Sequence, residues 1–168
     1  MLPIEQNLID PKWYQIASIT NMSPDNVFIN NMVTHAREMP ERKTVYHKSA
    51  RRQFPEPVAD ALEVVQDLFR SCSKFDTAVL KRYEGQSEAY NWHREPEEYV
   101  GNGDREMVLW TISGRAQLEV MTDGANIPIA FDCMPDSAKK LPAHTRHRVH
   151  PPDPVFGTRV LLWFGQRK

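Results

Sequence analysis

The sequence is poor in cysteine, in glycine and in long apolar runs, and each scarcity excludes a class of protein. Two cysteines in 168 residues, Cys72 and Cys133, are too few for a disulfide framework and lack the spacing of a zinc site. No apolar stretch is long enough to cross a membrane, so we expect no membrane partner. The first 15 residues lack a basic segment followed by an apolar one, which indicates a cytoplasmic protein without a secretory signal.

Net charge is also nearly absent. The 21 basic and 22 acidic residues leave a formal charge of -1, which gives no global electrostatic footprint for nucleic acid. A basic tract runs from Arg37 to Arg52, but a charge run is usually a solvated face of the protein. Only 7 glycines accompany 13 prolines, a mixture that favours many short elements over a bundle of long helices.

The length and the hydrophobic pattern predict a single domain with a helical front and a strand-rich back. Ser23-Pro24-Asp25 resembles a helix start, with a hydroxyl N-cap and proline at the first helical position. A second helix is predicted to begin near Pro57. Residues 37–54 between them show no periodicity, which predicts a loop or an irregular strand. We therefore expect a helical cover with a basic loop over residues 1–73.

After residue 73 short runs of β-branched and aromatic residues alternate with turn signals such as Ser113-Gly114. The fold class predicted is mostly β with helical cover (α+β), in a double-stranded β-helix or jelly roll that occupies residues 74–168. We expect the two helices to cover one outer face of it. The predicted strands span residues 75–83, 89–93, 107–113, 116–121, 127–131 and 158–164.

Histidine and glutamate residues in the back half suggest a metal site. His93 and Glu95 lie two positions apart at the end of a predicted strand, so both side chains point to the same face. One further histidine from a facing strand would complete a set of two histidines and one carboxylate. The candidates are His144, His147 and His150. In an extended segment His147 points away from the other two, and the sequence alone leaves the choice between these two directions open.

Two segments carry a family resemblance. Val79-Leu-Lys-Arg-Tyr83-Glu-Gly precedes Trp92-His93-Arg94-Glu95, and Leu141-Pro-Ala-His-Thr-Arg-His147 precedes Gly157-Thr-Arg159 in a final apolar run. A tyrosine and glycine before a His-x-Asp/Glu pair, and an arginine 12 positions after a later histidine, resemble the Fe(II)- and 2-oxoglutarate-dependent dioxygenases. The resemblance covers roughly residues 75–166.

The resemblance implies a function and a set of site residues. His93, Glu95 and His147 would be catalytic residues that bind Fe(II), and 2-oxoglutarate would be the cosubstrate. Arg159 would pair with the distal carboxylate of 2-oxoglutarate, and Tyr83 would add a hydroxyl to it. The activity implied consumes O2 and converts 2-oxoglutarate to succinate while a substrate is hydroxylated or oxidatively demethylated.

Alternatives remain at this stage. The prolyl-hydroxylase-like and nucleic-acid demethylase (AlkB-like) branches are both open, and the primary substrate is a protein side chain, a small metabolite or a nucleobase. A second resemblance is to the cupins, metal enzymes without 2-oxoglutarate, in which Glu106 would join His93 and His147 as a ligand. A third alternative is a non-catalytic jelly roll that only binds a partner.

Overall fold

The computed structural model describes residues 6–8, 17–19, 22, 24–48, 53–69, 75–83, 91–96, 105–121, 128–135, 137–143, 145–150 and 158–166. These residues form two α-helices and two antiparallel β-sheets, which confirms the expected α+β class with a mostly β body. Neither of the two helices so described has the length and hydrophobicity needed to cross a membrane.

The larger sheet has seven strands in the order β1-β2-β8-β5-β10-β4-β3, and the smaller has three in the order β7-β6-β9. Every pairing between neighbouring strands is antiparallel. Within the described residues neither sheet closes into a barrel. The strands are β1 (Gln6–Leu8), β2 (Ala17–Ile19), β3 (Lys43–His47), β4 (Thr77–Tyr83), β5 (Glu106–Ser113), β6 (Ala116–Met121), β7 (Ile129–Cys133), β8 (Ala138–Pro142), β9 (Arg146–Val149) and β10 (Arg159–Gly165).

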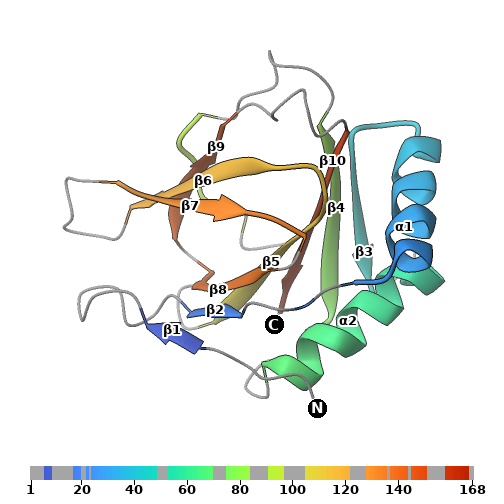
Figure 1. Ribbon diagram of the computed structural model, residues 1–168, viewed down its shortest axis with the longest axis horizontal. Helices are drawn as coiled ribbons and strands as arrows, with labels where there is room; N and C mark the ends of the chain where they lie inside the picture. The colour runs from blue at the N-terminus through green and yellow to red at the C-terminus, as the bar shows by residue number, and fades with distance from the viewer. Residues whose placement is uncertain are drawn as a thin grey trace.

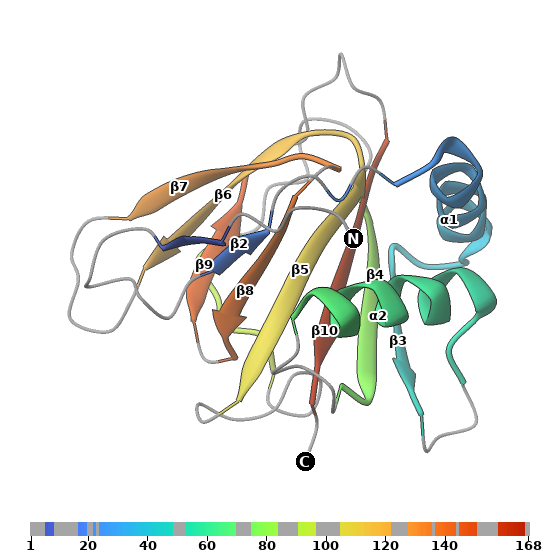
Figure 2. The same cartoon turned by 60° about the horizontal axis from the view of Figure 1, so that its bottom comes forward.

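Two helices, α1 (Asn26–Glu38) and α2 (Glu56–Leu68), lie on the same side of the larger sheet, as expected (Figure 1). Helix α2 runs across the strands of this sheet (Figure 2). The ring of Phe28 stacks on Trp110 of β5 at 5.4 Å between centroids. Arg82 on β4 donates to the carbonyl of Ala36 at 2.6 Å, which places a cation at the C-terminal end of α1 where the helix dipole is negative.

The start of α1 differs from the prediction. Asp25, not Ser23, is the N-cap, and its carboxylate accepts a hydrogen bond from the backbone N–H of Phe28 at 2.8 Å. A carboxylate at this position satisfies one of the helix's unpaired N–H groups as well as a hydroxyl does. The second helix begins at Glu56, one residue before the predicted proline, which occupies the first turn.

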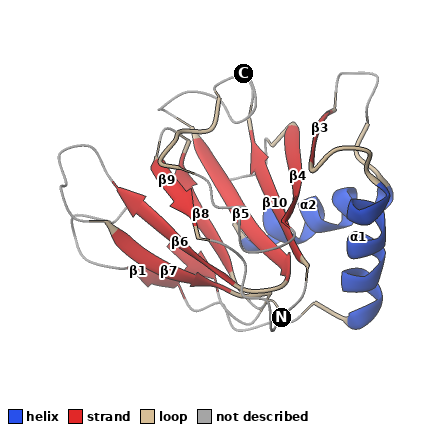
Figure 3. Ribbon diagram, turned by 90° about the horizontal axis from the view of Figure 1, so that it is seen from above, coloured by secondary structure: helices blue, strands red, loops and turns tan. Residues whose placement is uncertain are grey.

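Alternation of side chains along the strands divides the core into two layers, one on each face of the larger sheet. One layer faces the helices and includes Leu80, Val108 and Leu162. The other faces the smaller sheet and includes Val79, Leu109 and Leu161. Figure 3 shows the helices on one side of the larger sheet and β6, β7 and β9 on the other.

Several strands lie outside the predicted set. The tract expected to be a loop or an irregular strand contains β3, and β1 and β2 from the front of the chain also join the larger sheet. Strands β8 and β9 were not predicted, and β7 begins two residues later than expected. Of the strand predicted at residues 89–93, residues 89–90 lie outside the described part, and His93 forms an isolated bridge with His147.

Candidate metal centre

Three predicted ligands come together between the two sheets. The potential ligand atoms of His93, Glu95 and His147 all lie within 4.8 Å of one another. The Nε2 atoms of His147 and His93 face the same glutamate oxygen, Oε1, at 3.5 and 3.7 Å. Because the bridge between the two histidines holds their backbones side by side, two distant segments of the chain supply one cluster. This buried cluster can bind a metal ion.

The imidazole rings are oriented for ligation. Nδ1 of His93 lies 2.7 Å from the carbonyl of Asn91, and Nδ1 of His147 lies 2.9 Å from the carbonyl of Thr145. A carbonyl only accepts, so each Nδ1 carries the hydrogen and each Nε2 is left with its lone pair. Nε2 of His147 is buried and has no hydrogen-bond partner among the described residues. Such a carbonyl contact is the usual support of a metal-bound histidine.

Lys81 contacts the carboxylate of the cluster. Its Nζ lies 2.7 Å from Oε1 of Glu95, and both side chains are about 5% exposed. Burial would raise the pKa of Glu95, but the facing imidazoles of His147 and His93 and the ammonium of Lys81 outweigh it and hold that pKa well below its usual range. Burial lowers the pKa of Lys81, and Glu95 opposes that shift. Glu95 is therefore ionised at neutral pH and ready to bind a cation.

His147 lies deeper than its partner. Its side chain is 1% exposed, against 27% for His93. Burial lowers the pKa of His147, although Glu95 opposes the shift, so the ring is neutral at physiological pH, as a metal ligand must be. The ring packs on Trp163 of β10 with centroids 4.9 Å apart. Trp163 and Arg159 are four positions apart on β10, and both are buried.

Arg159 is a charged residue buried in the same interior layer as the triad. It has no exposed surface, its Nη2 donates to Thr111 Oγ1 at 3.4 Å, and its guanidinium lies 5.3 Å from the ring centroid of Tyr83. Its Nε and Nη1 have no hydrogen-bond partner, and no ion pair with a carboxylate is found for it within the described part of the chain. Burial lowers the pKa of Arg159, yet a guanidinium remains charged at neutral pH.

Tyr83 and Cys133 flank this arginine. Tyr83 pairs with Arg159 across β4 and β10 and is 2% exposed, so its ring forms one wall of the interior around the guanidinium. Cys133 is a buried free cysteine on β7, and burial raises the pKa of its thiol. A buried thiol with a raised pKa is unreactive, so its neighbourhood with Arg159 is one of packing.

Two of the other candidate ligands, His150 and Glu106, lie away from the cluster. His150 and Arg148 contact Glu119 on the outer face of the smaller sheet. His144 lies outside the described residues. Glu106, the ligand of the cupin alternative, forms an ion pair with Lys140 at 3.6 Å and is 43% exposed. Glu95 thus occupies the position beside the histidines that the cupin alternative gave to Glu106.

Trp92 neighbours the cluster but does not enter it. The guanidinium carbons of Arg146 and Arg148 lie 5.6 and 4.9 Å from its ring centroid, in positions suited to cation–π contacts. The ring is half-buried, so Trp92 is neither a core residue nor a wall of the triad. It covers the outside of β9 behind His147.

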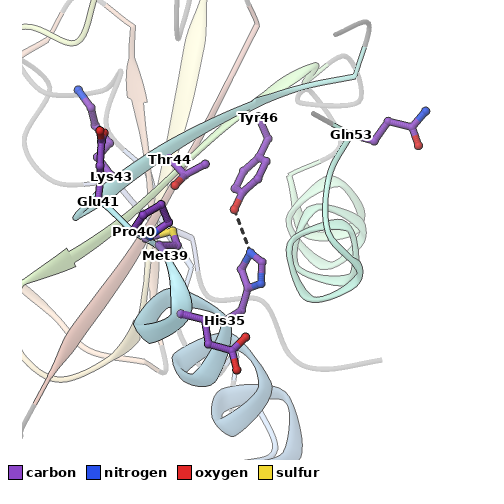
Figure 4. Close-up of a pocket in the computed structure, with 9 residues that line it drawn as sticks. His35, Met39, Pro40, Glu41, Lys43, Thr44, Tyr46 and Gln53 are labelled. Atoms are coloured by element: carbon purple, nitrogen blue, oxygen red, sulfur yellow. Dashed lines mark hydrogen bonds between the residues drawn. The ribbon is translucent and has the colours of Figure 1, made fainter. Parts of the chain in front are cut away.

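Two surface pockets lie on the helix side, away from the triad. One, of about 560 Å³, is bounded by α1, β3 and Gln53, and contains the hydrogen bond between His35 Nε2 and Tyr46 Oη at 2.9 Å (Figure 4). The other, of about 580 Å³, lies along α1 and the start of α2 and shares His35 and Glu38 with the first. Neither includes a residue of the metal cluster.

Comparison with known proteins assigns no family. No family model matches the chain, and a search of curated proteins finds no relative similar enough in sequence to count.

The contact of Lys81 with Glu95 is the feature of the site that the sequence analysis missed. The available signal was Lys81 itself, which alternates along the predicted strand with Val79 and Tyr83. Its side chain therefore points to the same face of the strand as theirs.

Proposed function

We propose that this protein is an Fe(II)- and 2-oxoglutarate-dependent oxygenase that hydroxylates or oxidatively demethylates its substrate. The observation that carries the proposal is the placement of a fully buried arginine with two unpartnered donor nitrogens in the same interior layer as the triad. A metal site explains the triad alone. Arg159 in addition requires an anion, and a cosubstrate with a carboxylate supplies one.

The residues fit a divalent iron. Two neutral imidazoles and one carboxylate are the donor set of non-haem iron centres with open coordination positions. The buried Nε2 of His147, which lacks a partner among the described residues, is the atom that a metal would satisfy. His93, His147 and Glu95 would hold the ion, and iron bound there supplies the activation of O2 that oxidative decarboxylation of 2-oxoglutarate needs.

Arg159 fits the distal carboxylate of 2-oxoglutarate. A buried guanidinium without a counter-ion is costly, and a bidentate carboxylate satisfies two of its donors at once. Arg159 and Trp163 are four positions apart on β10, roughly 13 Å between their Cα atoms. Both side chains turn into the layer that holds the triad. The protein's part is thus to fix one end of the cosubstrate while the triad holds the metal at the other.

The order of the strands supports the jelly-roll interpretation. Along the chain, β4 and β5 lie in the larger sheet, β6 and β7 in the smaller, β8 in the larger, β9 in the smaller and β10 in the larger. His93, between β4 and β5, bridges to β9 of the smaller sheet. With the segment of His93, eight extended segments are thus distributed between two facing antiparallel sheets, which is the pattern expected of a jelly roll.

The test is an anaerobic titration of the purified protein with Fe(II) and 2-oxoglutarate, followed by the weak visible charge-transfer band of the chelate. We expect the band in the wild type. Arg159→Ala should need much more 2-oxoglutarate to reach the same absorbance, because the carboxylate loses its charged partner. His147→Ala should give no band at any concentration, because one of three metal ligands is missing.

Two results would contradict the proposal. Metal binding without the band would remove 2-oxoglutarate from it and favour a metal enzyme of another class. Equal affinity of the wild type and Arg159→Ala for 2-oxoglutarate would mean that the buried arginine is structural. Production of succinate from 2-oxoglutarate, measured in air with and without added Fe(II), completes the test.

A further inference from the structure

Lys81 occupies a position where a cation is unexpected. It lies in the middle of β4, between β10 and β3 near the edge of the larger sheet, and is 4% exposed (Figure 1). The rest of its strand is largely apolar, and lysine is rarely buried unless it is paired. The partner here is Glu95, at 2.7 Å.

The contacted atom is the one that a metal would need. Oε1 of Glu95 faces Nε2 of His147, Nε2 of His93 and Nζ of Lys81. The three nitrogens therefore converge on one oxygen. Two of them are imidazole nitrogens, which can ligate a metal, while the third belongs to an ammonium, which cannot. A metal ion and Lys81 thus compete for the charge of the same carboxylate.

We propose that the Lys81 ammonium is the resident counter-cation of the metal-free centre, and that metal binding displaces it from Glu95. The inference rests on the metal site of the proposed function. Burial of the Glu95 carboxylate costs solvation free energy, and an ion pair with a cation offsets part of that cost. Lys81 supplies this cation in the empty protein, and a divalent ion takes over when it binds.

This role has two consequences of opposite sign. Removal of the ammonium destabilises the metal-free protein, because Glu95 is left buried and unpaired. The same removal strengthens metal binding, because the ion no longer competes with a charge already on the oxygen. A lysine that merely oriented Glu95 for ligation would give the opposite effect on affinity, since lost supporting contacts weaken metal sites.

The experiment compares wild type with Lys81→Met, which keeps the length of the side chain and removes the charge. The metal is removed with a chelator, thermal unfolding is followed by calorimetry, and Co(II), which does not oxidise readily in air, is titrated into each protein. For Lys81→Met we expect the Tm of the metal-free protein to fall by roughly 10 °C. We expect its Kd for Co(II) to fall by roughly tenfold or more.

Two variants serve as controls. Lys139→Met makes the same change at another buried lysine of the larger sheet, whose amine lies over the ring of Phe131 and outside the metal cluster. It should leave the Kd for Co(II) unchanged. Lys81→Arg keeps the charge and should keep the metal affinity within a few-fold of wild type. A lower Kd for Co(II) that is found in Lys81→Met and in neither control is then due to the lost charge.

The failures are distinguishable. If wild type and His147→Ala bind Co(II) equally, the metal site itself is wrong and both proposals fall. If wild type binds Co(II) through His147 but Lys81→Met binds it with equal or weaker affinity, only the role of Lys81 is overturned. An unchanged Tm for metal-free Lys81→Met, relative to Lys139→Met, overturns it as well.

A double variant decides the case in which Lys81→Met does not fold. Glu95→Gln removes the charge that Lys81 balances, so Lys81→Met should be tolerated in the Glu95→Gln background. Folding of the double variant, with a Tm near that of Glu95→Gln alone, supports the counter-cation role through their coupling. If the double variant also fails to fold, Lys81 is needed for packing and the proposal is overturned.

Discussion

The two faces of the larger sheet are built from the same strands, are equally buried and have opposite chemistry. Toward the helices, β4 and β10 present apolar side chains such as Leu80, Leu162 and Phe164. Toward the smaller sheet the same strands present Lys81, next to Leu80 in sequence, and Arg159, three positions before Leu162, beside apolar neighbours. One strand therefore contributes to an apolar core on one side and lies beside a possible metal site on the other.

The two faces contribute differently to the stability of the protein. The helix face gains free energy from apolar burial, which grows with the area removed from water. The inner face contains charges whose burial opposes folding unless each is paired. Glu95 and Lys81 pair with each other, whereas Arg159 contacts Thr111 and the ring of Tyr83 and, among the described residues, no carboxylate. The inner face thus gives up stability, which a bound ligand would restore under the proposed function.

The largest effect should come from the helix face. Leu162→Ala removes a fully buried side chain that lies between Leu80 and Trp110 in the register of the sheet. We expect a loss of about 2–5 kcal/mol in the free energy of unfolding, measured by urea titration, because the change leaves a cavity. Affinity for Co(II) in the folded protein should not change. A parallel loss of metal affinity would show that the two faces are coupled.

The turn that joins the two sheets should give the next largest effect. Gly114, between β5 and β6, has φ of 79°, and a Cβ placed there would lie 2.8 Å from the Cα of Arg159. Gly114→Ala adds left-handed backbone strain to this clash, so we expect a loss of about 1–3 kcal/mol. Because the clash falls on Arg159, affinity for 2-oxoglutarate should weaken while affinity for Co(II) is retained. Chemical unfolding and two titrations test this.

Arg159→Met, unlike Leu162→Ala and Gly114→Ala, should not lower the stability of the protein. It replaces a buried charge by an apolar side chain of similar length, so the free energy of unfolding should stay constant or rise by up to about 2 kcal/mol. Binding of 2-oxoglutarate should be lost. Urea titration of the variant beside Leu162→Ala makes the comparison direct. A loss of stability as large as that of Leu162→Ala would mean that Arg159 is a structural residue.

The smallest effect should come from the outer face of the smaller sheet. Partial burial would raise the pKa of Glu119, but the contacts with His150 and Arg148 outweigh it and the pKa is lowered. A lowered native pKa stabilises the fold above the unfolded value near 4.5, and this contribution is lost as the pH falls through the native value. Wild type should therefore exceed Glu119→Gln by less than about 1 kcal/mol at pH 7 and by a smaller margin at pH 3. Thermal unfolding at both pH values is the measurement.

The sequence predicted the triad but not the strands that assemble it. The spacing of His93 and Glu95 determines that they share a face, because side chains alternate along an extended chain. The inward direction of His147 depends on its pairing with Val120 of β6, a contact between distant segments that no local pattern reveals. The resemblance to a known family selected His147, and the structure places it beside the other two.

Three of the missed strands, β3, β8 and β9, share a physical cause. Strand β8 contains Lys139 and Lys140, and β9 contains Arg146 and Arg148, so charges interrupt the apolar alternation by which strands are predicted. Strand β3 lies in the basic tract, and its charges interrupt the apolar alternation in the same way. The long aliphatic parts of lysine and arginine pack against neighbours while their charged ends find partners, as Lys140 does with Glu106. Such strands depend on tertiary contacts, not on local sequence preference.

The central place of β10 has a consequence for the order of folding. It pairs with β4 on one side and β5 on the other, and the paired residues come 76 to 88 and 47 to 56 positions earlier in the chain. Those two strands are thus neighbours of β10 and not of each other, so the middle of the larger sheet cannot form until residues 159–165 arrive. Pairing over such sequence separation slows folding and leaves open strand edges until it is complete. We expect the His93–Glu95–His147 cluster to be among the last features to form, and metal added during refolding to act late.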